Sequence, residues 1–178
     1  MSELATIGAH PAEILKRIEA RLRSFLNLAD QCCFVSEDPR NVYPPSMPDR
    51  AYIITAEGSS FNSDGDQTRE LLIETGYYNV TCFNRLSAID ESSRAASLTS
   101  VCETNLFEMK RRALLALVGW RFDTENLPPL EIASTMKATR CGRPEFLSTE
   151  DGGVHAAFLP ITFSVSHTID LCNSDYNV

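Results

Sequence analysis

The feature that most constrains the fold is a long alternation of apolar and polar residues near the C-terminal end of the sequence. One side of the alternation holds Leu159, Ile161, Phe163, Val165, His167, Ile169 and Leu171, and the other holds Thr162, Ser164, Ser166, Thr168 and Asp170. Successive side chains of a β-strand point to opposite faces of a sheet, so this period of two predicts a strand. One apolar and one polar face are typical of an antiparallel sheet that is covered on one side and wet on the other.

Two stretches with helical periodicity supply a cover for that sheet. In residues 11–28 the apolar side chains recur at helical spacing, and Pro11 suits the first helical position. This stripe holds Ile14, Ile18, Leu22, Phe25 and Leu26. A second helix is expected over about 98–118, with residues 90–100 as its approach and Gly119 as its C-terminal cap. Its stripe holds Leu98, Val101, Cys102, Leu106, Met109, Ala113 and Leu117.

Shorter β-patterned segments complete the order of elements. They cover residues 31–35, 51–57, 71–75, 77–83 and 130–140, with polar or proline-rich loops at 37–50 and 58–67 and a turn at 150–153. Strands do not alternate one for one with helices, which disfavours a doubly wound sheet. The sequence predicts a single α+β domain, residues 1–178, of two layers, with two main helices packed on one face of a mainly antiparallel β-sheet.

Composition restricts the class of protein. Of 178 residues, 43% are hydrophobic, enough for a core, and no run approaches the ~20 apolar residues of a membrane span. Met1 to Pro11 lack a secretory pattern, so we expect a soluble, intracellular chain without disulfides. The 16 basic and 24 acidic residues give a net charge of −8, which disfavours nucleic-acid or membrane binding by bulk charge.

Signatures of catalysis and of metal binding are missing from the sequence. The six cysteines form no C-x-x-C pair, and there is no phosphate-binding loop or nucleophile elbow. His167 shares the apolar side of the last strand and is expected to be a core histidine. Asp64-Gly65-Asp66 lacks the other ligands of a calcium loop. We expect no metal, no cofactor and no enzymatic activity, although a Cys–His pair formed only in the fold stays open.

Several segments, in this order, resemble a family of viral assembly proteins. The segments are Ile14 to Leu26, Ala51 to Gly58, Tyr77 to Phe83 with Asn84-Arg85, Leu106 to Leu117 with Gly119-Trp120, and Leu159 to His167. Together they resemble the tail terminator and neck-region minor tail proteins of long-tailed phages and prophages. The resemblance spans most of the chain and lies in the order of elements and a diffuse pattern.

The resemblance implies a non-enzymatic protein that forms a ring, commonly a hexamer, at the head-proximal end of the tail tube. Such a ring stops tube polymerisation and joins the tail to the head. The implied partners are further copies of the chain, the tail tube protein and a head completion or connector protein. DNA would pass through the lumen without specific binding, and an acidic lumen would repel its phosphates. The implied location is the virion tail and, during assembly, the cytoplasm of the host bacterium.

Two other classes stay open. One is a different head–tail joining component of the neck. The other is a cytoplasmic enzyme or small-molecule-binding domain whose site forms only in three dimensions. A large concave pocket with converging polar groups would favour the latter, and a flat, self-complementary lateral surface would favour the ring.

The candidate contact surface is the loop from Gly58 to Gln67. Its proposed contact residues are Ser59, Ser60, Phe61, Asp64 and Asp66. Glycine and serine give the loop backbone freedom, and loops of this length are often functional. Phe61 is a large apolar residue in a polar stretch. It therefore either tucks back onto the sheet, leaving Asp64 and Asp66 at the tip in water, or anchors a partner.

Overall fold

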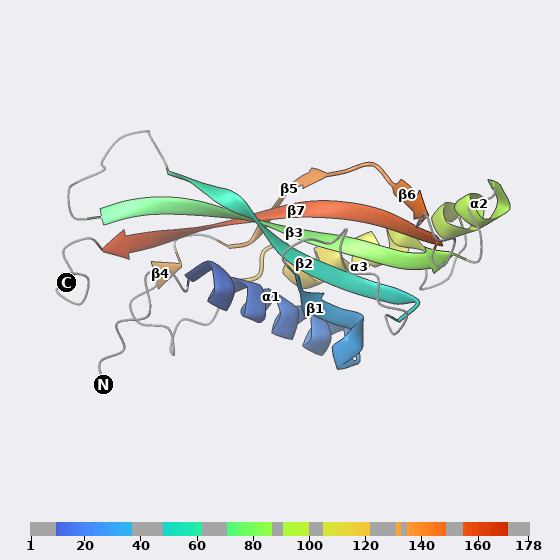
Figure 1. The fold of residues 1–178 in the computed structure, drawn as a ribbon. Helices are drawn as coiled ribbons and strands as arrows, with labels where there is room; N and C mark the ends of the chain where they lie inside the picture. The colour runs from blue at the N-terminus through green and yellow to red at the C-terminus, as the bar shows by residue number, and fades with distance from the viewer. Residues whose placement is uncertain are drawn as a thin grey trace.

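Two antiparallel strands of 16 residues each, β3 (Leu71–Leu86) and β7 (His155–Asp170), form the centre of the fold. They pair along their whole length, from Leu71 opposite Asp170 to Leu86 opposite His155. The computed structural model describes residues 10–36, 48–61, 71–86, 91–99, 105–121, 131–132, 135–148 and 155–170 (Figure 1).

Shorter strands extend the sheet on both sides of this pair. On one side β2 (Arg50–Phe61) runs antiparallel to β3, and β1 (Cys33–Val35) runs parallel to β2. On the other side β4 (Glu131–Ile132), β5 (Lys137–Cys141) and β6 (Glu145–Ser148) each pair antiparallel with β7. The helices are α1 (His10–Leu26), α2 (Glu91–Thr99) and α3 (Leu106–Leu117), and a 3-10 turn, η2 (Asp30–Cys32), precedes β1. The predicted α+β class with a mainly antiparallel sheet is confirmed.

A core of buried side chains joins α1 and α3 to one side of the sheet, called here the helix face. Helix α1 contributes Ile14, Ile18 and Leu22, and α3 contributes Leu106, Met109, Ala113, Ala116 and Leu117. The sheet contributes Tyr52 and Ile54 of β2, Tyr78, Val80 and Cys82 of β3, and Ala157, Leu159, Ile161, Phe163 and Val165 of β7. The alternation in the final strand therefore marks the covered side of the sheet, as predicted.

Some element boundaries differ from the prediction. Residues 58–61, expected in a loop, belong to β2, and the expected strands 71–75 and 77–83 are a single strand. The expected helix over 98–118 is two helices, α2 and α3. Asn105 is the N-cap of α3, since its side chain accepts a hydrogen bond from the Phe107 amide at 2.8 Å. This cap marks the N-terminal end of α3 as a separate helix. The turn at 150–153 and most of the loop 37–50 lie outside the described residues.

One member of the predicted α1 stripe is not in the core. Phe25 is 48% exposed, and the guanidinium of Arg21 lies 4.9 Å from the centre of its ring. The helix ends one residue later, at Leu26, and Asn27 takes a positive φ of 52°. Phe25 therefore belongs to the surface of the helix layer.

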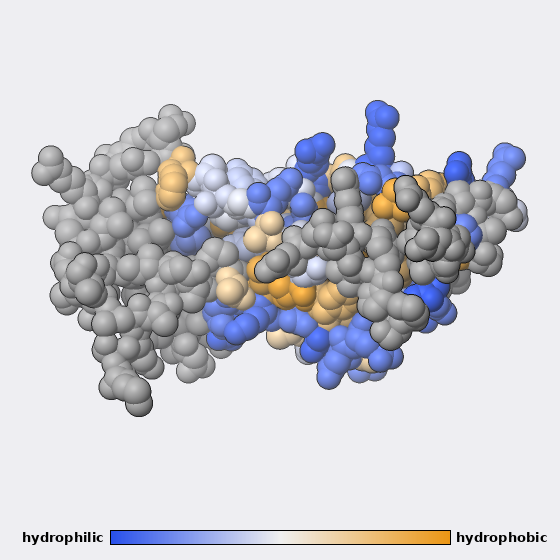
Figure 2. Space-filling model, viewed as in Figure 1, coloured by the Kyte–Doolittle hydropathy of each residue, from blue (hydrophilic) through white to orange (hydrophobic). Residues whose placement is uncertain are grey.

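Figure 2 shows hydrophilic residues along the upper and lower margins of the described part of the molecule, with hydrophobic residues between them.

The opposite side of the sheet, called here the outer face, is not simply wet. Ala51, Ile53, Phe83, Ala156 and Phe158 form a second, smaller buried cluster there. Thr162 and Ser164, predicted to face water, are only 8% and 7% exposed. Thr162 donates a hydrogen bond to Asn79 Oδ1 at 2.7 Å, and its carbonyl accepts one from the Thr139 hydroxyl. These bonds satisfy the hydroxyl and the carbonyl of Thr162, which is the condition for burying them.

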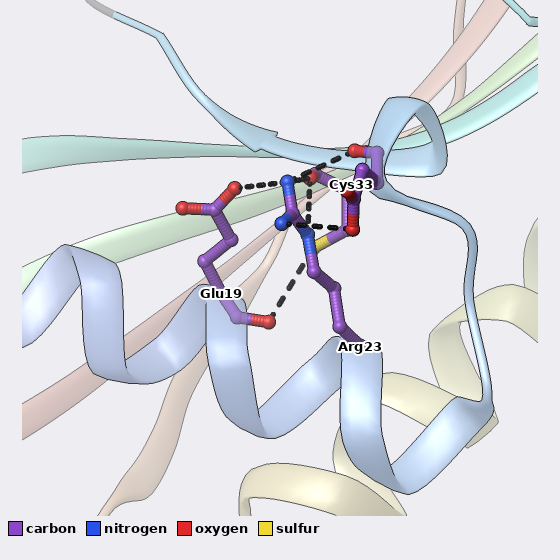
Figure 3. Close-up of polar contacts among 4 residues, drawn as sticks. Glu19, Arg23 and Cys33 are labelled. Carbon is purple, nitrogen blue, oxygen red and sulfur yellow. Dashed lines mark hydrogen bonds and ion pairs between the residues drawn. The ribbon is translucent and has the colours of Figure 1, made fainter.

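Arg23 fastens the first β segment to α1. Its guanidinium donates to the carbonyl oxygens of Cys33, at 2.8 and 3.0 Å, and of Asp30, at 2.9 Å (Figure 3). It also forms an ion pair with Glu19 at 2.6 Å. Cys33 is fully buried beneath this arrangement, and burial raises the pKa of its thiol to about 12, with a further contribution from Glu19. The thiol is therefore a protonated core group.

None of the helices within the described ranges is both long and apolar enough to cross a bilayer.

We predict that Arg23→Met lowers the free energy of unfolding by about 2 kcal/mol, because the carbonyls of Asp30 and Cys33 lose charged donors. Arg17→Met is the matched control, since Arg17 lies on the same helix and, among the described residues, forms its ion pair with Glu13, with both side chains about one-third exposed. Its expected cost is about 0.5 kcal/mol or less. Chemical denaturation of both variants measures the difference, and equal losses would contradict the role assigned to Arg23.

Candidate assembly surface

A β-bulge decides which way the end of β2 faces. The register of β2 against β3 passes from Ala56 opposite Tyr78 to Gly58 opposite Tyr77, so Glu57 is an extra residue. Gly58 has a φ of +135°, a conformation that other residues rarely adopt. The extra residue reverses the alternation: Phe61 pairs with Glu74 and so lies on the helix face. Without the bulge, Phe61 would lie on the outer face.

Phe61 ends β2 in an exposed position. Its side chain is 57% exposed, so it does not tuck back onto the sheet. Ser59 and Ser60 are exposed beside it, and the hydroxyls of Ser60 and Tyr77 lie 3.2 Å apart. Three of the five proposed contact residues are thus strand residues, held in register by β3. Asp64 and Asp66 lie outside the described residues.

The sheet beneath Phe61 contains a buried polar pair. His167 Nε2 lies 3.1 Å from Glu74 Oε2, and the imidazole is only 2% exposed. The predicted core position of His167 is therefore confirmed. On the outer face at the same level, the hydroxyls of Thr75 and Ser166 are 2.8 Å apart. Strands β3 and β7, beside which β2 ends, are thus joined by side-chain contacts as well as by their backbones.

One edge of β2 is open over the same residues. Strand β1 pairs with β2 only as far as Ile54, and the last bond runs from the Ser36 amide to the Ile54 carbonyl. From Ala56 to Phe61, no residue in the described part of the chain pairs with the edge that faces away from β3. All six residues there are exposed. An unpaired strand edge is a template for another chain.

A concave groove of about 620 Å³ lies on the outer face of the sheet. Its lining comes from β2, β3, β7 and the β5–β6 segment: Glu57, Asn79, Thr81, Arg140, Cys141, Gly142, Arg143, Glu145, Leu147, Phe158, Pro160 and Thr162. Its charged side chains are two arginines and two glutamates, so the lining carries no net charge. Cys141 is the one thiol in the lining, and no histidine lies among these residues to activate it.

The helix layer carries an exposed apolar patch of its own. Phe107, Leu115 and Val118 of the α3 region are 44%, 58% and 51% exposed, and Phe25 is exposed on α1. Arg21 lies between α1 and α3, because its guanidinium stacks on both Phe25 and Trp120 and donates to the Ala116 carbonyl. Residues 107, 115 and 118 recur at helical spacing on the side of α3 away from its buried residues. The sequence pattern predicted only the buried stripe of this helix.

The described cysteines and acidic residues form no metal centre. Cys32, Cys33, Cys82 and Cys141 are free thiols, and burial is the main cause of the raised pKa of Cys82. Across the described ranges no three His, Cys, Asp or Glu side chains come close enough together to hold a metal ion. Cys102 and Cys172 lie outside these ranges.

A scan against protein-family models finds no match to this chain, and a search of curated proteins finds none with significant similarity.

We predict that Phe61→Ala lowers the free energy of unfolding by less than about 1 kcal/mol, because its ring is more exposed than buried. Phe163→Ala is the matched control on the same sheet face. Phe163 is fully buried, and its truncation is expected to cost about 3–5 kcal/mol. Thermal and chemical unfolding measure both variants. A large loss at Phe61 would show that it packs in the core.

We predict that Gly58→Ala costs about 1–3 kcal/mol, because its φ of +135° strains any residue with a Cβ. The cost is conformational, since nothing lies within 4 Å of the added carbon. Ser59→Ala, one residue along the same exposed strand, should be close to neutral. Equal stability of the two variants in urea would mean that β2 continues without the bulge.

Proposed function

We propose that this chain is a structural assembly protein of the tail terminator type. It forms a ring at the head-proximal end of a phage or prophage tail tube. The resemblance of its segments to tail terminator and neck proteins supports this proposal. So does the observation that carries it: no described residue pairs with the outer edge of β2 from Ala56 to Phe61, and this segment ends at a phenylalanine that is 57% exposed.

Physical reasons connect this surface to assembly. Unpaired strand edges supply backbone donors and acceptors to a second chain, and exposed aromatic rings are frequent anchors of protein interfaces. The bulge turns Phe61 to the helix face, where it projects from β2 opposite Glu74, and its ring is 57% exposed. The protein can therefore fold alone and keep this surface for a partner.

The proposed partners are further copies of the chain, commonly six, the tail tube protein and a head completion or connector protein. DNA passes through the lumen without specific recognition, in keeping with the net charge of −8. The protein acts in the host cytoplasm during assembly and remains in the virion tail. It needs no cofactor and catalyses no reaction. Another head–tail joining role in the neck is the alternative within the same class.

The groove on the outer face favours a second candidate function, the binding of a small polar molecule that carries an acidic group. Arg140 and Arg143 would hold that group, and Glu57, Glu145 and the neutral Asn79, Thr81 and Thr162 complete the polar part of the lining. Isothermal titration with phosphate and with small carboxylates tests this candidate. Saturable binding that Arg140→Gln abolishes would favour it over assembly.

We predict that the protein limits the length of tubes formed by its cognate tail tube protein. Electron microscopy of tubes grown with and without the protein gives the length distribution. Phe61→Ala should remove most of the limiting effect while the protein stays folded. Phe107→Ala is the matched control, because Phe107 is similarly exposed but lies on α3. Tubes that grow to the same length with and without the wild-type protein would contradict the proposal.

A further inference from the structure

The sheet has open edges on opposite sides, and the two edges carry opposite charge. On the β2 side, Glu57 is the one charged residue between Ala56 and Phe61. On the other side, β5 contains Lys137 and Arg140 and no acidic residue. Strand β5 pairs with β7, and within the described ranges no residue pairs with its second edge.

The three charges lie on the same face of the sheet. Lys137 pairs with Ser164 and Arg140 with Thr162, so both project on the outer face with those residues. Glu57 lines the outer-face groove beside Asn79 and Thr81. None of the three charged groups forms an ion pair with another described residue. Side chains on one face of paired strands are the ones that interact across the strands.

The geometry points to a specific contact between two copies: the open β2 edge of one copy pairs with the β5 edge of the next, and Glu57 lies beside Lys137 and Arg140. This inference rests on the proposed function, because it assigns the lateral contact of the proposed ring. Two β2 edges would place like charges together, and so would two β5 edges. The charges therefore disfavour a two-fold dimer and favour head-to-tail association.

Strand direction fits this contact. Strands β2 and β7 are both antiparallel to β3, and β5 is antiparallel to β7, so β5 and β2 run in opposite directions within one chain. Continuing the sheet into a second copy with the same face outward therefore makes an antiparallel strand pair. A head-to-tail contact uses two different surfaces of each subunit, and it closes into a ring when the rotation between copies allows it.

Charge reversal tests the contact. Glu57→Lys and the double variant Lys137→Glu/Arg140→Glu should each weaken self-association roughly tenfold, because like charges then face each other. A 1:1 mixture of the two variants should restore assembly, since every contact in an alternating ring again joins opposite charges. Sedimentation velocity over a range of concentrations and salt, alone and with tail tube protein, measures the association. Circular dichroism checks that each variant is folded.

Matched controls separate this contact from net charge. Glu91→Lys on α2 changes charge as Glu57→Lys does, and Lys16→Glu/Arg121→Glu matches the double variant at exposed positions. Neither control should weaken association, and their mixture should behave as the wild type. If the wild type forms rings and both charge-reversal variants form them equally well, this contact is wrong, although the ring itself stands. A wild-type protein that stays monomeric at every concentration and on the tube protein would overturn the ring and the contact together.

Discussion

The pairing of β3 with β7 along 16 residues is the constraint on which the rest of the structure depends. These strands place the side chains of the helix face where α1 and α3 can bury them, and they give β2, β5 and β6 their partners. On the β2 side, β1 has only three residues and pairs with β2 only as far as Ile54. Within the described part of the chain, the edge of β2 beyond Ile54 and the second edge of β5 are therefore unpaired.

Periodic patterns made much of the fold predictable. The apolar alternation from Leu159 to His167 and the stripe of Ile14, Ile18 and Leu22 each indicate burial at a fixed spacing, and the structure buries all of these residues. It also buries Thr162 and Ser164, which the alternation placed on the polar side. The end of β2 escaped prediction for a physical reason. Gly58, Ser59 and Ser60 have weak preferences of their own, and they are strand residues because β3 continues beside them.

The candidate surface was predictable only in part. Phe61 is conspicuous in sequence because its neighbours are polar, but its direction depends on the bulge at Glu57 and Gly58, which no local pattern reveals. The position of the β5 charges relative to Glu57 depends on the order of strands in the sheet. Lys137 and Arg140 are some 80 residues from Glu57 in the chain, and only the order of strands shows that they occupy opposite edges of one sheet face.

Amide hydrogen exchange would show whether the protein assembles through the edge of β2 at residues 56–61. Compared in the monomer and in the tube-bound or self-assembled state, the amides of residues 56–61 that point away from β3 should become strongly protected. The amides of β3 and β7, already bonded within the chain, should change little. Unchanged exchange at residues 56–61 in a fully assembled sample would contradict assembly through this edge.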